Sequence, residues 1–271
     1  MTKHKEKKTI EDATSLAPRL IYEVIRREGE EELQRPAKSL IWSGIAAGLM
    51  ISFSVLGEAI LRTYLPDMPS RHLIENLGYS FGFLLVILGR LQLFTENTIT
   101  TVFPLVAKPT LHMLTNVLKL WGIVLAANVV GALAAASLFA FTPAIPSDLL
   151  PAIAALSEHA LGYDPATAFM RAIPAGILVA ALVWMIPQST HSVFWLIVAI
   201  TWLIAAGDFA HIVAGSVEMW FLLVTGATTA GDAVFAFFLP VLAGNIVGGT
   251  LVFTMLAWGQ VQEEIDENPK E

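Results

Sequence analysis

The sequence has no cysteine and few charged residues. Lys, Arg, Asp and Glu make up 14% of its 271 residues, whereas they make up about a quarter of an ordinary soluble domain. Without cysteine the chain can form no disulfide, thiolate metal site or cysteine nucleophile. The six histidines lack the spacing of metal ligands, so no metal or cofactor is expected. The scarcity of basic residues, with a net charge of −7, also argues against a nucleic-acid binder.

Hydrophobic residues are abundant instead, at 55% of the chain, and the mean hydropathy is +0.66. At about 20 residues per bilayer crossing, this composition predicts an all-α membrane protein with six transmembrane helices. The apolar runs lie at about 40–61, 73–107, 113–141, 167–187, 191–225 and 233–258.

The distribution of basic residues predicts the orientation in the membrane. Residues 1–38 contain nine Lys or Arg, and the connection at 142–166 contains none. By the positive-inside rule, we expect both termini of this multi-pass protein of the cell (inner) membrane to lie in the cytosol. We therefore expect a cytosolic segment with an amphipathic helix at 1–37, a transmembrane domain at 38–258 and an acidic cytosolic tail at 259–271.

Two apolar runs are too long for one crossing. A helix over 191–225 would be about 52 Å long, against a hydrocarbon core of about 30 Å. This run and the run at 73–107 both carry polar residues near their middle. Because unwound backbone inside a membrane must face protein or a water-filled cavity, we expect two broken helices that line an interior pathway.

An internal repeat relates the two halves of the chain. The segment 125–131 (LAANVVG) matches 242–248 (LAGNIVG) at an offset of 117, and Thr95 and His211 are 116 residues apart. Three helices used twice would have opposite orientations, and such an inverted repeat with broken second and fifth helices indicates a central transport site. Asn128 and Asn245 either belong to this site or hold two helices together by hydrogen bonds.

His211 is the main candidate for a functional residue, because an ionisable side chain inside an apolar run is a functional hypothesis by default. Imidazole can accept, donate or relay a proton, and the Thr95 hydroxyl can donate to an anion or to His211. The other candidate pore residues are the polar Asn97 and four apolar residues that either form constrictions or simply pack, namely Leu91, Leu93, Phe94 and Phe209.

Several charged residues within or beside the runs are expected to pair or to reach an interface: Glu58, Arg90, Glu96, Arg171, Asp208, Glu218 and Asp232. Arg90 with Glu96 or Glu218 would make a neutralised pair.

The motifs in these runs resemble the formate/nitrite transporter family over about residues 35–258. Residues 93–97 (LFTEN) resemble the family's loop in the second helix, 209–211 (FAH) its histidine segment in the fifth, and 244–249 (GNIVGG) its sixth-helix motif. The resemblance implies an aquaporin-like fold assembled as a homopentamer with one pore per protomer. It also implies that Thr95 is the loop threonine, that His211 is the central pore histidine, and that Leu93 and Phe94 lie near the cytosolic constriction.

The sequence departs from the family pattern at several positions. Glu96 replaces the loop glycine, Ala210 the glutamate before the histidine, Gly176 an asparagine of the fourth helix and Gly215 the asparagine that follows the histidine. The family's lysine at the outer start of the fourth helix is missing, since no Lys occurs between Lys119 and Lys270. The chain therefore resembles a divergent, YfdC-type inner-membrane branch, and its permeant species stays open.

Together these features predict a channel or transporter, not an enzyme, for small monovalent weak-acid anions such as formate, nitrite or similar monocarboxylates. Transport would be coupled to protons through His211, with the bilayer, the anion and protons as partners. A neutral-solute channel and a transport-inactive regulatory membrane protein remain alternatives, although no Asn-Pro-Ala signature supports the former. An intramembrane hydrolase using His211 with Ser216 or Asp208 would lack the Gly-x-Ser-x-Gly motif.

Overall fold

The structure is a computed structural model that describes residues 16–189 and 192–266, and in these ranges every regular element is a helix. Four of the described helices are long and apolar enough to cross a bilayer. They are α3 (Ala37–Tyr64), α8 (Leu111–Phe141), α10 (Pro165–Met185) with η3 (Ile186–Gln188), and the continuous helix formed by η4 (Asp232–Phe238), α13 (Leu239–Ile246), η5 (Val247–Thr254) and α14 (Met255–Asp266).

The other two apolar runs each form shorter helices separated by five residues. In the first, α5 (Ser80–Leu88) is followed by residues 89–93 and then by α6 (Phe94–Thr100) and α7 (Val102–Ala107). In the second, residues 207–211 separate α11 (Val193–Ala206) from α12 (Ile212–Val224). We call residues 89–93 the first break and residues 207–211 the second break.

Helix starts follow from local capping chemistry. The Thr110 hydroxyl accepts a hydrogen bond from the Met113 amide at 3.1 Å at the start of α8. At the start of α10, the Asp164 carboxylate accepts from the Ala166 and Thr167 amides, and Pro165 occupies the first helical position. Both residue types supply an acceptor for amides that lack a partner within the helix.

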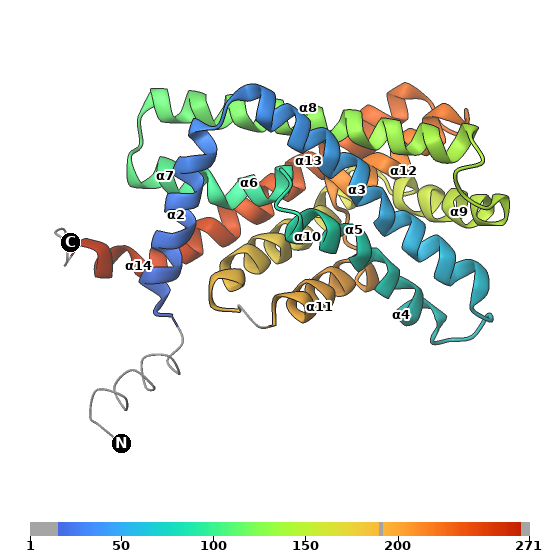
Figure 1. Ribbon diagram of the computed structural model, residues 1–271, viewed down its shortest axis with the longest axis horizontal. Coiled ribbons are helices and arrows are strands. Elements are labelled where there is room, and N and C mark those ends of the chain that lie inside the picture. The colour runs from blue at the N-terminus through green and yellow to red at the C-terminus, as the bar shows by residue number, and fades with distance from the viewer. Residues whose placement is uncertain (1–15, 190–191, 267–271) are drawn as a thin grey trace, which may run out of the picture.

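Glycines allow two pairs of long helices to pack backbone against backbone. A Cβ added to Gly131 of α8 would lie 2.2 Å from the Ile45 carbonyl oxygen of α3, and one added to Gly248 of η5 would lie 2.1 Å from that of Ile173 in α10. Figure 1 shows α3 and α8 side by side along the molecule. The α3–α8 pair and the α10–α13 pair thus form equivalent close contacts in the two halves of the chain.

The two ends of the helix bundle differ. At one end, α2 (Pro18–Gln34) lies across α6 and α7 and beside α14 (Figure 1). At the other end lie α4 (Arg71–Glu75) and α9 (Leu150–Leu161) (Figure 1). The short helices η1 (Asn76–Tyr79) and η2 (Ser147–Leu149) follow α4 and precede α9, respectively.

The buried face of α2 includes a glycine. Ile21, Tyr22, Ile25 and Gly29 are buried, whereas Leu20 is exposed. A Cβ added to Gly29 would lie 1.9 Å from the Thr100 carbonyl oxygen. The backbone of α2 therefore lies directly against α6, the helix that follows the first break.

Helices also occur in the connection at 142–166 and in the segment expected as an acidic tail. The connection at 142–166 contains α9, whose Ala152, Ile153 and Ser157 are buried. The segment expected as a tail from residue 259 instead continues α14 to Asp266, with Val261 buried, because α14 packs against α2. The remainder of the expected tail, residues 267–271, lies outside the described residues.

Candidate functional site

The two breaks share the same backbone conformation. Each begins with a glycine, Gly89 or Gly207, and continues with a residue of positive φ, Arg90 (49°) or Asp208 (57°). Two residues into each break, the amide of Leu91 or Phe209 donates to the carbonyl five residues earlier, at 3.0 Å in both cases. A left-handed conformation in two non-glycine residues at matching positions means that the surrounding contacts hold both breaks in shape.

Asn128 and Asn245 hold the breaks in place by equivalent hydrogen bonds. Oδ1 of Asn128 accepts from the Phe94 amide at 2.9 Å, and Oδ1 of Asn245 accepts from the Ile212 amide at 2.8 Å. Both side chains are fully buried. The carbonyl groups that accept from their Nδ2 atoms lie in the breaks and in the neighbouring long helices: Gln92 and Gly44 for Asn128, Ala210 and Ala172 for Asn245.

These hydrogen bonds correct the expected equivalence of Thr95 with His211. Because the Phe94 and Ile212 amides occupy equivalent positions, the counterpart of His211 is Leu93. The offset at the breaks is therefore 118 and not 116, since 212 − 94 = 118. The two polar residues nevertheless meet: His211 is the N-cap of α12, and Thr95 lies two residues after Leu93, the N-cap of α6.

His211 and Thr95 are in direct contact. Nε2 of His211 lies 2.8 Å from Oγ1 of Thr95, and both side chains are buried, with His211 2% exposed. Nδ1 of His211 accepts from the Ala214 amide at 3.3 Å, so His211 is the N-cap of α12. Since Nδ1 acts as an acceptor, the proton of the neutral ring lies on Nε2 and is donated to Thr95.

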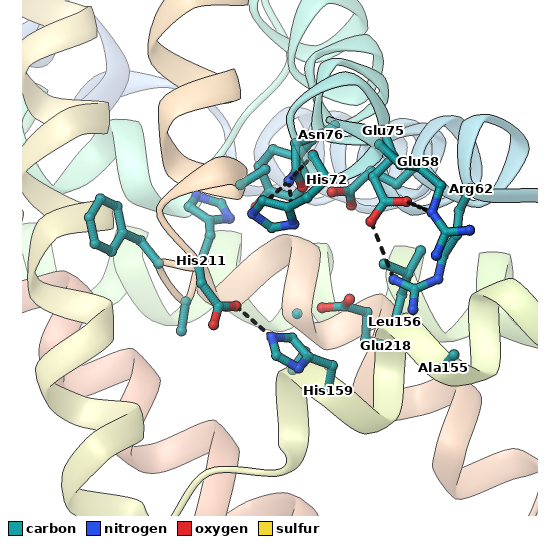
Figure 2. A pocket seen from close by; sticks show the side chains of 18 of the residues that line it. Glu58, Arg62, His72, Glu75, Asn76, Ala155, Leu156, His159, His211 and Glu218 are labelled. Carbon is teal, nitrogen blue, oxygen red and sulfur yellow. Dashed lines mark hydrogen bonds and ion pairs between the residues drawn. The ribbon is translucent and has the colours of Figure 1, made fainter. Parts of the chain in front are cut away.

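The His211 ring lies at the bottom of a cavity of about 650 Å³, which we call the vestibule. Figure 2 shows His211 beside this space, with Glu58, Glu75 and Glu218 at its other walls. The vestibule lining includes residues of α4, α9 and the end of α3, and α4 and α9 lie at the opposite end of the bundle from α2 (Figure 1). Thr95 does not line the vestibule, so His211 separates it from Thr95.

The lining of the vestibule is rich in ionisable groups. The two arginines pair with acids of the same wall: Arg62 lies 3.4 Å from Glu75, and Arg71 lies 3.4 Å from Asp67 and 3.5 Å from Glu75. The complete set of ionisable lining residues, apart from Tyr79 and Tyr163, is Glu58, Arg62, Asp67, Arg71, His72, Glu75, His159, Asp208, His211 and Glu218.

Asp208 connects the second break to the vestibule wall. Its carboxylate accepts from His159 at 2.9 Å and also from Tyr163 and Arg171. The Arg171 guanidinium in turn lies over the Tyr163 ring, 4.2 Å from its centroid. The expected pairing of Arg171 is thus found, and it explains how Asp208 is stabilised at positive φ.

The apolar candidate residues take different positions. Leu93 and Phe94 are buried, and the Phe94 ring packs edge-on against Trp121 at 5.7 Å. Leu91 is partly buried in the first break. Phe209 lines the vestibule. Leu93 and Phe94 therefore lie beside Thr95 on the far side of His211, and Phe209 lies on the near side.

The polar candidates near the first break serve mainly as structural contacts. Asn97 is buried and donates to Gln92 Oε1 at 3.3 Å. Gln92 donates to Glu32 of α2 at 2.6 Å, which links α2 to the first break. Oε1 of Glu96 is buried without a hydrogen-bond partner in the described part of the chain.

The expected pairing of Arg90 with Glu96 or Glu218 is wrong for residues 16–189 and 192–266, in which Arg90 forms no ion pair. Its side chain is exposed at the α2 end, near Glu28, whereas Glu218 lines the vestibule. The left-handed backbone turn directs Arg90 away from the interior.

The sequence singles out Glu58 and Glu218, because each interrupts an apolar run, but it does not show that they share a cavity with His211. The positions of Glu75, His72 and His159 at this cavity could not be predicted. These residues lie in α4 and α9, and nothing in the sequence indicates where those two helices pack. Three acids or histidines that could hold a metal ion are not found together in the described ranges. The Ser216 hydroxyl, considered for a hydrolase, donates to the Ile212 carbonyl at 2.6 Å.

Comparison with known proteins gives concordant results. Residues 19–259 match the model of a family described as formate/nitrite transporter. The chain is 41% identical to "Inner membrane protein YfdC" of Escherichia coli (strain K12) over 250 residues, which covers 92% of this chain and 81% of that protein. It is 27% identical to "Formate channel FocA" of Haemophilus influenzae, covering 80% of this chain and 84% of that protein.

Two solved structures share the fold. The "Pentameric formate channel with formate bound" superposes with a TM-score of 0.71 at 24% identity, covering 83% of this chain and 98% of that one. An "FNT family ion channel" superposes with a TM-score of 0.75 at 16% identity, covering 89% and 98%. At these identities the superpositions concern the fold of the protomer.

Proposed function

Because the chain belongs to the formate/nitrite transporter family, and is therefore a membrane transport protein and not an enzyme, we propose that it conducts small monovalent weak-acid anions together with protons. Formate, nitrite and similar monocarboxylates are the proposed solutes. The single observation that carries this proposal is the hydrogen bond of 2.8 Å between His211 and Thr95 at the bottom of the vestibule.

The proposed architecture follows from the same resemblance. Six crossings, with the runs at 73–107 and 191–225 broken, would form an inverted repeat within a transmembrane domain at 38–258. Both termini, including the segment 1–37 and the tail 259–271, would lie on the cytosolic side of the inner membrane, with α2 across the inner mouth. We also propose a homopentamer, because the formate channel that shares this fold is pentameric. In this orientation the vestibule opens outward.

A weak acid crosses the apolar region at a lower free-energy cost as a neutral molecule than as an anion. Carrying a bare charge past the buried Leu93 and Phe94 would cost several to more than ten kcal/mol. Protonating an acid of pKa about 4 at pH 7 costs about three pKa units, or roughly 4 kcal/mol. Protonation before the apolar region is therefore the less costly route.

His211 and Thr95 supply a route for that proton. His211 would gain a proton from water in the vestibule at Nδ1, which breaks the bond from the Ala214 amide, and lose one at Nε2 to Thr95 Oγ1. Thr95 would pass its own hydroxyl proton to the solute. One proton enters the ring and one reaches the solute, so charge and protons balance. The N-terminus of α12 faces the same position and favours an approaching anion.

Liposome flux measurements test this function. Purified protein in proteoliposomes with an imposed pH gradient should accelerate the entry of formate, nitrite or acetate, and the rate should rise as the side from which the solute enters is acidified. A rate no higher than in protein-free liposomes for every anion would overturn the proposal. Flux of glycerol without flux of any acid would favour the neutral-solute alternative.

A further inference from the structure

Two carboxyl groups in the vestibule have no partner. Glu58, which is 6% exposed, and the partly buried Glu218 form no hydrogen bond or ion pair with the residues that the structure describes. The nearby cations do not reach them, because Arg62 and Arg71 pair with Glu75 and Asp67. A buried carboxyl group that lacks a protein partner is stabilised either by a proton or by a bound cation.

The two carboxyl groups face the same space. Glu218 follows His211 by seven residues, so both lie on one face of α12. Glu58 projects from α3, which packs against α12, and Glu58 and Glu218 both line the vestibule. Figure 2 shows Glu58, His211 and Glu218 arranged around one opening. A solute that approaches His211 through the vestibule therefore passes between two acids.

Aromatic rings complete the wall around these acids. Tyr79, Phe209 and Phe237 all line the vestibule. Tyr79 is held against Phe83 at a centroid distance of 5.2 Å, and Phe83 packs edge-on against the His211 ring at 5.0 Å. Carboxylates combined with aromatic faces are the environment that recognises ammonium groups.

The same geometry disfavours a hard metal ion. Calcium and magnesium need six or more oxygen ligands at short distance, whereas the described residues contain no group of three acids or histidines suited to a metal. An ammonium group needs only acceptors for its N–H bonds and can use the aromatic faces. The cavity of about 650 Å³ also leaves room for water around the ion.

We propose that Glu58 and Glu218 form a binding site in the vestibule for a small ammonium-type cation, meaning ammonium itself or a small primary amine. The bound cation lies between the two carboxylates and beside the Tyr79 and Phe237 rings. The site goes beyond the transport of weak acids, because its occupancy does not depend on flux. A cation held there also offsets the negative charge that an entering anion would otherwise meet.

Equilibrium binding of radiolabelled methylammonium to the full-length protein in lipid nanodiscs tests this site. We expect saturable binding to the wild type. Glu58→Gln and Glu218→Gln should each weaken it by about tenfold, the size expected for loss of one charge-assisted hydrogen bond. Glu158→Gln is the matched control, because Glu158 is exposed on α9 and does not line the vestibule. It should bind as the wild type does.

Three results would overturn the proposal: no saturable binding by the wild type, unchanged binding by both vestibule variants, or displacement by sodium as effective as by unlabelled methylammonium. If Glu58→Gln does not fold, Glu218→Gln alone decides, since Glu218 is only partly buried. The readout is binding and not flux, so its failure would leave the proposed weak-acid transport to be judged by the liposome measurements.

Discussion

Asn128 and Asn245 form the same hydrogen bonds in the two halves of the molecule. Each Oδ1 accepts from the first amide of the helix that follows a break, at 2.9 and 2.8 Å. Each Nδ2 donates to one carbonyl within the break and one in a neighbouring long helix. One buried amide side chain thus fixes a break between two helices, which places His211 and Thr95 within hydrogen-bonding distance.

We expect Asn128→Ala and Asn245→Ala to destabilise the protein to a similar degree. Each removes three hydrogen bonds and leaves buried backbone groups unpaired, at a cost of about 2 to 4 kcal/mol. The thermal unfolding midpoint of the purified protein in detergent measures the effect. Asn116→Ala, at a partly exposed position of the same helix as Asn128, should change it little. A much smaller effect for one asparagine than for the other would contradict their equivalence.

The close helix contacts predict opposite effects for two glycine substitutions in α8. Gly131→Ala should destabilise strongly, because the new Cβ would lie 2.2 Å from the Ile45 carbonyl oxygen. Gly122→Ala should be neutral or stabilising by up to about 1 kcal/mol, because no atom lies within 4 Å of its Cβ position and alanine favours helix. Unfolding midpoints measured side by side check this, and equal midpoints would be incompatible with the packing described.

The positive φ of Arg90 predicts a stabilising substitution. Glycine at this position relieves a left-handed conformation that costs an ordinary residue about 1 to 2 kcal/mol. Arg90→Gly should therefore unfold at a higher temperature than Arg90→Ala, which also lacks the side chain but keeps the strained backbone. If the alanine variant proved at least as stable as the glycine variant, the strain at Arg90 would not exist.

The helix α2 contains an ion pair that should be lost only in strong acid. Glu23 accepts from Arg26 at 2.7 and 2.8 Å, which lowers the pKa of Glu23 from 4.5 to about 2. Because the folded pKa lies below the ordinary value, this contribution is complete above about pH 5 and is lost as the pH falls toward 2. The contribution of this ion pair to stability is small, since the Glu23 side chain is partly exposed.

Hydrogen exchange of the α2 amides, corrected for intrinsic rates, measures this dependence. Protection should be constant from neutral pH to about pH 5 and decrease below it. In the Glu23→Gln variant, the decrease in protection below about pH 5 should be smaller than in the wild type. A decrease that begins near neutral pH would show that a different group controls the stability of α2.

The sequence predicts the long helices well because each one is a continuous apolar run of residues. The apolar runs reproduce α3, α8 and α10 to within a few residues, and the polar residues at 89–97 and 207–211 mark the breaks. The sequence also singled out His211 and Thr95, which lie in contact. Both the breaks and the pair of His211 and Thr95 were found by one rule: a polar group inside an apolar membrane-spanning segment has a structural or functional role.

The parts that sequence reasoning missed depend on long-range packing. The buried face of α2 is determined by Gly29 against Thr100, and no periodicity in α2 reports that contact. The equivalence of Leu93 with His211 required the hydrogen bonds of Asn128 and Asn245, because the repeat offset changes by one residue between the asparagines and the breaks. The vestibule combines residues from α3, α4, α9 and α12, whose proximity only the fold reveals.

The most direct test of the account is the pH dependence of formate flux in proteoliposomes containing His211→Phe. The control is His112→Phe, at an exposed position of α8 remote from the vestibule. With assembly verified for both variants, we predict that His211→Phe abolishes pH-dependent flux and that His112→Phe retains it. Flux through His211→Phe with the rate and pH dependence of the wild type would contradict the central role of this imidazole.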